Sequence, residues 1–488
     1  MGRTVLAGAG VVRDLVDAFA EAVRRYPHRP AIIHNGSPLS YRDLDARVRA
    51  TAQALGPAPG VVGVHTSHTP GTVVGLLGVL AAGGTYCPID PAYPVTRQDT
   101  MLTVPGIRTV LATGPIPSVP PGVAVLRLPE KGPEPEPFTV IDTDAPAYLL
   151  FTSGSTGDPK PVVTPRAAVA ITVAAVRGLF GITSADRVLQ FASLSWDTCF
   201  EEILPTLVSG AALVFDDEAY TGSFPRFLRL VERESISVLD LPTAYWHELV
   251  RYLAEDDTQL PECLRLVIIG GEAASAARVK DWHALRTGGI RLLNTYGCTE
   301  TTLITHAADL DGSRAGVPIG LPLPHVWERI SDDGELLIGG PALALGYLGR
   351  PDDTQARFVE LHDGRYFRTG DRVRRARDGL LFHDGRLDHE IKIRGIRVDP
   401  AEVEAQLTQH PSVTAVAVTA VVRAGQPTLV AYVVAAGHDD LRDWLRERVP
   451  AHLVPSRITV VPDLVSTASG KIDRAATHRR YDPKEAVQ

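Results

Sequence analysis

Apolar and polar positions along most of this 488-residue chain alternate in blocks that predict strands followed by helices. Short apolar runs bounded by turn residues predict buried strands, and apolar residues every three or four positions predict helices packed on them. Such alternation is typical of a largely parallel sheet covered by helices. The predicted strands cover residues 31–34, 61–65, 85–90, 147–151, 188–191, 212–215, 237–240, 266–269 and 290–293. The predicted helices cover residues 12–26, 39–44 at the start of a second helix, 71–83, 166–180, 201–208, 224–233 and 243–253.

The pattern changes beyond Gly316, where short apolar runs such as residues 334–339 predict a β-subdomain. A charged strand over residues 389–398 and a small α/β unit follow. The fold class is therefore α/β: a large N-terminal domain of parallel-rich sheets with helices plus a β-subdomain, residues 1–387, and a small mobile C-terminal α+β domain, residues 388–488. The remaining predictions are strands over residues 413–421 and 428–434, a helix over 441–449, a surface loop over 115–137 and an interdomain boundary near 384–389.

Composition narrows the function classes. Apolar residues make up 44% and charged residues 22% of the chain, which is ordinary for a soluble globular protein. The net charge of −8 gives no electrostatic basis for binding nucleic acid or an anionic membrane. The longest mainly apolar stretch, residues 167–176, is about half of the ~20 residues that a membrane span needs. Four scattered cysteines have no metal-ligand spacing, so we expect a protein of the reducing cytoplasm.

The first stretch with evident chemistry is Tyr148-Leu-Leu-Phe-Thr-Ser-Gly-Ser-Thr-Gly-Asp-Pro-Lys160. An apolar strand leads into a loop of glycines, hydroxyl side chains and a lysine, which together supply backbone N–H groups, donors and charge for a polyphosphate. The Walker A pattern cannot be fitted to it. A polar surface turn is the alternative for the Thr-Gly-Asp-Pro part alone. The candidate phosphate-binding residues are Thr152, Ser153, Gly154, Ser155, Thr156, Gly157 and Lys160.

Ligands of open parallel sheets bind past the carboxyl ends of the strands. By that rule four residues that end predicted strands should meet in one crevice: Ser153, Asp240, Gly270 and Asn294.

Further motifs follow in a fixed order along the chain. They are Leu39-Ser-Tyr-Arg-Asp-Leu, Leu80-Ala-Ala-Gly-Gly-Thr-Tyr-Cys-Pro-Ile-Asp90, the phosphate loop, Asn294-Thr-Tyr-Gly-Cys-Thr-Glu300, Tyr366-Phe-Arg-Thr-Gly-Asp371, Gly385-Arg-Leu-Asp388, Lys392-Ile-Arg-Gly395 and Ser469-Gly-Lys-Ile-Asp473. With these motifs the chain resembles the adenylate-forming superfamily, and within it the amino-acid adenylation domains of nonribosomal peptide synthetases. The resemblance covers nearly the whole chain.

The resemblance implies attack of a carboxylate on the α-phosphate of ATP, which gives an acyl-adenylate and pyrophosphate. Such a step needs positioning and charge neutralisation. The resemblance assigns catalytic roles to Thr152, Glu300 and Lys471. Glu300 would be the Mg²⁺ ligand, and Lys471 would bridge the substrate carboxylate and the α-phosphate. The implied nucleotide-binding residues beyond the loop are Asn294, Tyr296 (on adenine), Gly297, Thr299, Asp371 (on the ribose hydroxyls), Arg386 and Lys392. Taken singly, Asp371 reads as a turn residue and Lys471 as a solvated loop residue, and only the motif order favours the chemical roles.

Matched residue by residue, the family's substrate pocket would be formed by Asp197, Thr198, Glu201, Asp240, Ile268, Gly270, Thr295, Leu303, Ile304 and Lys471. Asp197 matches the residue that pairs with an α-amino group, which favours an amino acid. Two carboxylates in a dry pocket, Glu201 and Asp240, are costly unless a cation meets them. Gly270 would leave room for a long substrate side chain, so we expect lysine, ornithine or a related diamino acid as the substrate. Whether the substrate is the α- or the β-amino isomer is left open. The alternative is that Glu201 only starts its helix and points to water.

The family's second half-reaction transfers the acyl group to the phosphopantetheine thiol of a carrier, with the small domain turning about a hinge at Asp388. No carrier motif follows Lys471 and no condensation domain is seen, so we expect a free-standing enzyme and a separate carrier protein. An MbtH-like helper is left open as a partner. Pro161 replaces the usual glycine after the loop lysine, which predicts a less mobile loop, and Glu390 is a candidate partner of Lys392.

Two rival functions remain. An acyl- or aryl-CoA ligase of the same superfamily is disfavoured by Asp197 and the acidic pocket. A non-catalytic binding protein on this fold is disfavoured by the presence of Glu300, Asp371 and Lys471.

Overall fold

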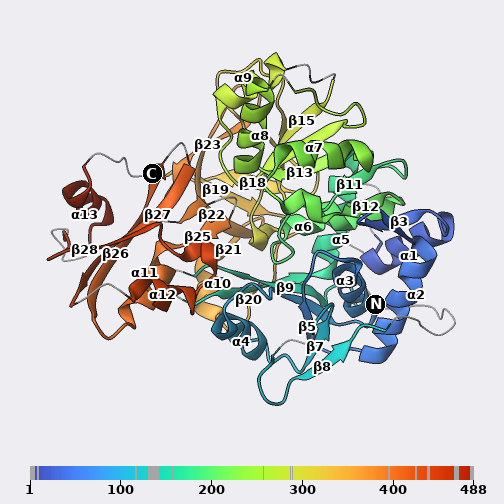
Figure 1. Cartoon of the computed structure of the whole chain (residues 1–488), viewed down its shortest axis with the longest axis horizontal. Helices are drawn as coiled ribbons and strands as arrows, with labels where there is room; N and C mark the ends of the chain where they lie inside the picture. The colour runs from blue at the N-terminus through green and yellow to red at the C-terminus, as the bar shows by residue number, and fades with distance from the viewer. Residues whose placement is uncertain are drawn as a thin grey trace. The chain divides into compact units, whose positions relative to one another are not determined.

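The computed structural model describes residues 6–7, 10–11, 13–115, 118–129, 142–154, 158–256, 258–285, 287, 289–388, 390–393, 396–423, 426–436, 440–466 and 472–483. They form two compact units, drawn in Figure 1. The first unit comprises Met1–Asp90, Val104–Leu150 and Pro161–Leu387. The second comprises Asp388–Gln488 together with two earlier segments, Pro91–Thr103 and Phe151–Lys160.

A seven-stranded sheet of the strand order β20-β10-β9-β6-β5-β7-β8 occupies the first part of the chain. Its strands β9, β6, β5, β7 and β8 run parallel, whereas β10 and β20 pair antiparallel. The bounds are β5 Val61–His65, β6 Thr85–Ile89, β7 Thr109–Ala112, β8 Ala124–Arg127, β9 Pro146–Thr152, β10 Lys160–Pro165 and β20 Gly346–Tyr347. The helices between these strands are α3 Pro70–Ala81 and α4 Val95–Thr103.

A nine-stranded sheet has the order β17-β16-β15-β14-β13-β11-β12-β3-β4. Its central strands, from β15 to β3, are parallel, and β16, β17 and β4 are antiparallel edges. The strand bounds are β3 Pro30–His34, β4 Ser37–Ser40, β11 Arg187–Leu189, β12 Ala212–Phe215, β13 Val238–Pro242, β14 Leu266–Gly270, β15 Arg291–Tyr296, β16 His306–Asp309 and β17 Leu321–Pro322. The helices are α1 Leu15–Arg25, α2 Tyr41–Leu55, α5 Arg166–Phe180, α6 Thr198–Ser209, α7 Phe224–Arg233, α8 Thr243–Glu255 and α9 Ala276–Ala284, with short 3₁₀ turns at Asp217–Tyr220 and Thr299–Thr301.

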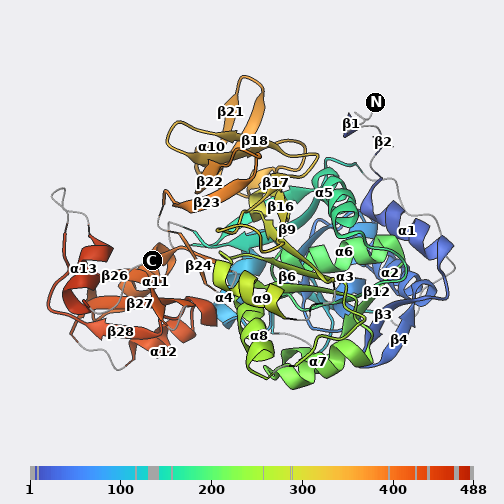
Figure 2. The ribbon, with the colours of Figure 1, turned by 90° about the horizontal axis from the view of Figure 1, so that it is seen from above.

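The predicted β-subdomain is present, and Figure 2 shows its strands gathered beside helix α10. The order is β18-β19-β22-β21, and β23 pairs with β22. The bounds are β18 Trp327–Ile330, β19 Glu335–Gly339, α10 Pro351–Arg357, β21 Phe358–Leu361, β22 Gly364–Arg375 and β23 Leu381–Arg386. A separate hairpin near the N-terminus joins β1 Leu6–Ala7 to β2 Gly10–Val11.

The second unit is built on a three-stranded sheet of order β26-β27-β28 and a two-stranded hairpin of β24 and β25. Its core consists of aliphatic side chains, among them Val403, Leu407 and Val418. The bounds are β24 Ile391–Ile393, β25 Ile396–Val398, α11 Pro400–Thr408, β26 Val413–Arg423, β27 Gln426–Ala435, α12 Leu441–Arg446, a 3₁₀ turn at Ala451–Leu453, β28 Arg457–Val460 and α13 Arg474–Tyr481.

Local sequence signals account for several element ends. The Asn35-Gly36 turn joins β3 to β4 with both residues at positive φ, 48° and 76°, as a tight hairpin turn requires. Helix α2 begins where the Ser40 side chain accepts the N–H of Asp43. Helix α5 ends at Gly181 in the left-handed conformation.

The mixed α/β architecture with parallel-rich sheets is as predicted, but some local predictions were wrong. The expected single strand over 389–398 is two short strands, β24 and β25. The described part of the proline-rich loop 115–137 contains strand β8, which pairs with β7 by backbone hydrogen bonds that composition does not report. Helix α6 begins at Thr198 rather than Glu201, and strand β15 continues through Tyr296. None of the helices in the described ranges has the length and hydropathy of a membrane span.

Candidate active site

Three of the four residues predicted to share one crevice lie on neighbouring strands of the nine-stranded sheet. In the parallel register Asp240 lies beside Ile268, and Gly270 lies beside Thr295. Asn294 pairs with Ile269, one position beyond the level of Asp240, so the side chains of Asp240 and Asn294 point to opposite faces of the sheet. Ser153 follows β9 of the other sheet and belongs to the second unit, and its place in this crevice stays a prediction.

Asp197 lies at the N-terminal cap of α6 and is followed by Thr198. The pKa of Asp197 is raised to about 6, mainly by burial. The hydrogen bond from Thr299 lowers this pKa, and the Glu300 carboxylate raises it. A carboxylate held by a hydroxyl, and otherwise desolvated, favours a cationic ligand over a neutral one.

Glu201 and Asp240 form a buried acidic pair. Their exposed fractions are 6% and 4%, so the alternative in which Glu201 points to water is wrong. Oδ2 of Asp240 is buried without a hydrogen-bond partner among the described residues. Burial raises the pKa of Asp240 to about 7. It also raises the pKa of Glu201, and the charges of Asp240 and Asp197 add to this shift.

Two pocket residues were not found from the sequence. The Glu202 carboxylate accepts hydrogen bonds from the N–H groups of Phe191 and Ala192, both at 2.9 Å, and thereby anchors the turn after β11. Tyr148 is 2% exposed. Burial and then the Asp197 charge raise its pKa, whereas a hydrogen bond with Thr164 lowers it. Because Tyr148 sits in an apolar strand, the pattern marked it only as core.

Three of the remaining predicted pocket residues, Ile268, Leu303 and Ile304, have buried side chains. A Cβ at Gly270 would lie 2.5 Å from Oγ1 of Thr295. This glycine accommodates the Thr295 hydroxyl, and room for a long substrate at Gly270 stays a prediction.

The turn after β15 is tight and strained. A Cβ at Gly297 would lie 1.9 Å from the carbonyl oxygen of Leu303. Thr302 and Leu303 both have positive φ, 60° and 61°, which is rare for side chains branched or bulky near the backbone. This strain lies beside the pocket and fixes the 3₁₀ turn that presents Glu300.

The predicted nucleotide residues of the first unit form a connected cluster. Tyr296 donates a 2.6 Å hydrogen bond to Oδ2 of Asp371. Oδ1 of Asp371 accepts from Arg386 at 2.7 Å and interacts with Nε2 of His383 at 3.1 Å. Arg386 lies opposite Asp371 in the pairing of β22 with β23. The motifs containing Tyr296, Asp371 and Arg386, far apart in sequence, thus converge as their assignment to one ligand requires.

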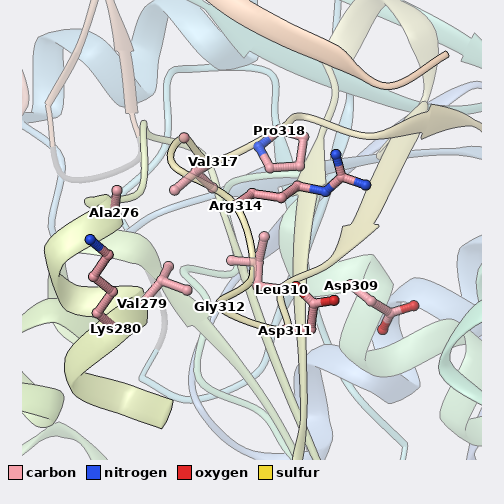
Figure 3. A pocket seen from close by; sticks show the side chains of 11 residues that line it. Ala276, Val279, Lys280, Asp309, Leu310, Asp311, Gly312, Arg314, Val317 and Pro318 are labelled. Carbon is pink, nitrogen blue, oxygen red and sulfur yellow. The ribbon is translucent and has the colours of Figure 1, made fainter. Parts of the chain in front are cut away.

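Asn294 adds an orphan acceptor to the same region. Its Nδ2 donates to the carbonyl of Pro318 at 2.8 Å, and its buried Oδ1 has no partner among the described residues. Pro318 also lines a small cavity of ≈ 10 Å³ (Figure 3), which has room for about one water and not for a nucleotide. The free Oδ1 suits a donor such as an exocyclic amine.

The described phosphate-loop residues lie within the second unit. Ser153 donates to the carbonyl of Arg397 at 2.9 Å, and Thr152 donates to the carbonyl of Lys160 at 3.4 Å. A Cβ at Gly154 would lie 2.0 Å from the carbonyl oxygen of Asp158, so only glycine fits this turn. Ser155, Thr156, Gly157 and Lys471 lie outside the described residues.

At the start of the C-terminal unit, Glu390 has a partner besides the predicted candidate Lys392. Glu390 forms an ion pair with Arg397 at 2.5 Å, a partner that the sequence did not indicate. Lys392 lies in β24, and Asp388 accepts the N–H of Glu390 at 3.2 Å.

Glu300 is the carboxylate predicted to hold a magnesium ion. Glu300 is 1% exposed, and its Oε1 accepts a 2.7 Å hydrogen bond from Tyr347. Within the described ranges no three His, Cys, Asp or Glu side chains gather as a metal site. One carboxylate fits Mg²⁺ in the usual nucleotide arrangement, where phosphates and water complete the coordination.

Two known protein families match this chain. Residues 19–348 match the AMP-binding enzyme family, and residues 402–471 match the AMP-binding enzyme C-terminal domain. The chain belongs to the AMP-binding enzyme family. It is thus an adenylate-forming ligase that uses ATP.

This AMP-binding enzyme is similar to parts of larger synthetases. It is 41% identical to an isonitrile lipopeptide synthase of Streptomyces coeruleorubidus over 494 residues, which cover 96% of this chain. The chain spans 33% of the length of that synthase.

Two solved structures share its fold. Holo-PA1221, a nonribosomal peptide synthetase protein with adenylation and PCP domains bound to a vinylsulfonamide inhibitor, has a TM-score of 0.83 and 26% identity over 96% of this chain and 84% of its own. A malonyl-CoA ligase with methylmalonyl-CoA and AMP bound has a TM-score of 0.79 and 26% identity over 95% of this chain and 99% of its own.

Proposed function

We propose that this AMP-binding enzyme activates a basic amino acid as its aminoacyl-adenylate and transfers it to the phosphopantetheine thiol of a carrier protein. The observation that carries the substrate class is the buried pair Glu201 and Asp240, which has no ion-pair partner among the described residues. A lysine- or ornithine-like side chain would supply the missing cation.

Asp197 supports the amino-acid assignment. A substrate α-ammonium would pair with its carboxylate, which the Thr299 hydroxyl orients. Pro205 lies inside α6 and has no N–H, so the carbonyl oxygen of Glu201 lacks its usual helical donor and offers another acceptor beside the acidic pair.

The nucleotide would lie along the Tyr296–Asp371–Arg386 cluster. Asp371 would accept the ribose hydroxyls, and Asn294 Oδ1 would accept from the adenine amine. The loop residues Thr152–Lys160 would bind the departing pyrophosphate. A magnesium ion held by Glu300 would neutralise phosphate charge. Lys471 would place a positive charge between the carboxylate and the α-phosphate.

Carrier loading is supported by the relatives. The chain resembles part of a lipopeptide synthase and a structure that contains a PCP domain. The hinge role of Asp388 belongs to this proposal, and an MbtH-like helper is left open as a partner.

ATP–pyrophosphate exchange over a panel of amino acids tests the substrate class. We expect lysine, ornithine or a related diamino acid to stimulate exchange well above norleucine. Stimulation by neutral or acyl substrates alone would contradict the basic-substrate assignment.

The acceptor is tested separately, with a phosphopantetheinylated carrier or free coenzyme A added to the activated substrate. The similarity to a malonyl-CoA ligase makes coenzyme A the necessary second arm. Thioester formation on coenzyme A and not on any carrier would replace the carrier proposal by an acyl-CoA ligase.

A further inference from the structure

The acidic pair in the pocket raises the question of where its protons are. Glu201 and Asp240 come from different elements, α6 and β13, yet the Asp240 charge is the largest electrostatic influence on Glu201 after burial. Two buried carboxylates that act on each other cannot both ionise without a cation.

The surroundings supply acids and hydroxyls instead of cations. Charges that act on Glu201 come from Asp240, Asp197 and Glu202. Glu202 is already satisfied by its three donors, the N–H groups of Phe191 and Ala192 and the Gln190 amide. No described Lys, Arg or His forms an ion pair with Glu201 or Asp240.

One buried polar atom of the pair lacks a partner among the described residues. It is Oδ2 of Asp240, in a side chain that is 4% exposed. Unsatisfied buried polar atoms are rare in folded proteins, so this oxygen points to a ligand that brings a donor and a positive charge.

We propose that Glu201 and Asp240 share one proton in the substrate-free protein and release it to solvent when the cationic side chain of the substrate enters. This inference rests on the proposed basic-amino-acid specificity. The O–H bond of the shared proton breaks, the proton leaves to buffer, and the substrate ammonium takes its place between the two carboxylates. The charge of the pocket is thereby unchanged on binding.

Proton exchange gives the pocket a means of discrimination. A neutral side chain of equal length leaves the proton in place and leaves Oδ2 of Asp240 unsatisfied. A cationic side chain competes with the proton, so its apparent affinity rises with pH until the pair is ionised. The pair thus recognises charge through the proton that it gives up.

Isothermal titration calorimetry of the intact protein with lysine, in buffers of different ionisation enthalpy, measures the released proton directly. We expect about one proton released per lysine at pH 6 and a smaller number at pH 9, because the pair then begins ionised. Norleucine, which has the same chain length without the ammonium, is the matched control and should release none from this pair.

The pH dependence of the lysine and norleucine KM values in pyrophosphate exchange provides the second readout. Both substrates share the contact of the α-amino group with Asp197, so their KM ratio isolates the acidic pair. The ratio of the norleucine KM to the lysine KM should rise by up to about tenfold per pH unit between pH 5.5 and 7.

The Asp240→Asn variant should bind lysine more weakly and lose most of the proton release, and the wild-type KM ratio remains decisive if this variant does not fold. Lysine or ornithine binding with no proton release and a flat KM ratio would overturn the inference while leaving the basic specificity standing. Failure of every basic amino acid to bind would overturn the proposed specificity, and the proton exchange with it.

Discussion

The hydroxyl of Tyr296 on β15 donates a 2.6 Å hydrogen bond to Oδ2 of Asp371 on β22. The two residues are 75 positions apart, and the bond joins the end of the parallel sheet to the β-subdomain. Each side chain thereby fixes the orientation of the other at the proposed nucleotide site.

Tyr296→Phe should weaken ATP binding while preserving the ring. A hydrogen bond to a charged group contributes about 1.5–3 kcal/mol to the folded protein. Without it Asp371 loses its orientation, so the KM for ATP should rise by about tenfold for each 1.4 kcal/mol of binding free energy that is lost. The KM for the amino acid serves as the internal control and should change little. A change confined to the amino-acid KM would place Tyr296 in the wrong half of the site.

Asp240→Asn should stabilise the substrate-free protein at pH 8. The pKa of Asp240 is raised to about 7, so the folded state holds a proton that the unfolded state has lost above about pH 4. The decrease in the free energy of unfolding that Asp240 causes therefore grows from about pH 4 to 7 and reaches its full size above pH 7. We expect a gain on the order of 1–3 kcal/mol at pH 8 and a smaller gain at pH 5.

Urea unfolding of the wild type and of Asp240→Asn at the two pH values measures this difference. A larger gain at pH 5 than at pH 8 would show that the carboxylate is not destabilised by burial. The same variant should lose affinity for a basic substrate, as expected where binding groups are held in an unfavourable environment.

Gly297→Ala should destabilise the protein and reduce adenylation. The added Cβ would lie 1.9 Å from the backbone oxygen of Leu303, and backbone cannot move aside without disturbing the turn that presents Glu300. Gly178→Ala is the matched control, because a Cβ there meets nothing within 4 Å in helix α5 and alanine is the better helix former. The thermal unfolding temperature should fall by several degrees for Gly297→Ala and should stay equal or rise for Gly178→Ala. Equal unfolding temperatures of the two variants would refute the close approach at Gly297.

Lys471→Ala should reduce ATP–pyrophosphate exchange by at least about 100-fold and leave ATP binding nearly unchanged. The reason is that the proposed charge acts on the transferring group and not on the adenine or ribose. Lys280→Ala, at an exposed lysine of helix α9, is the control for loss of a positive charge. Exchange at the wild-type rate in Lys471→Ala would contradict its proposed role.

Sequence periodicity was sufficient for the elements whose apolar pattern is complete within one segment. Helices α5 and α7 and strand β12 have the predicted bounds, since their burial patterns repeat over their whole length. Motif order likewise predicted that Tyr296, Asp371 and Arg386 act together, and the family match confirms the superfamily from which those roles were inferred.

Tertiary structure alone decided what these residues touch. A glycine in a sequence shows only that a side chain is absent, and the structure shows that the Thr295 hydroxyl fills the space at Gly270. An acid in a first helical turn can face water or core, and the packing of α6 buries Glu201 beside Asp240 from another strand. Tyr148 is core, as its apolar strand predicts, and only the structure brings it under the influence of the Asp197 charge. Local patterns specify elements, because backbone geometry repeats over a few residues, whereas burial and pairing depend on segments that the chain brings together only on folding.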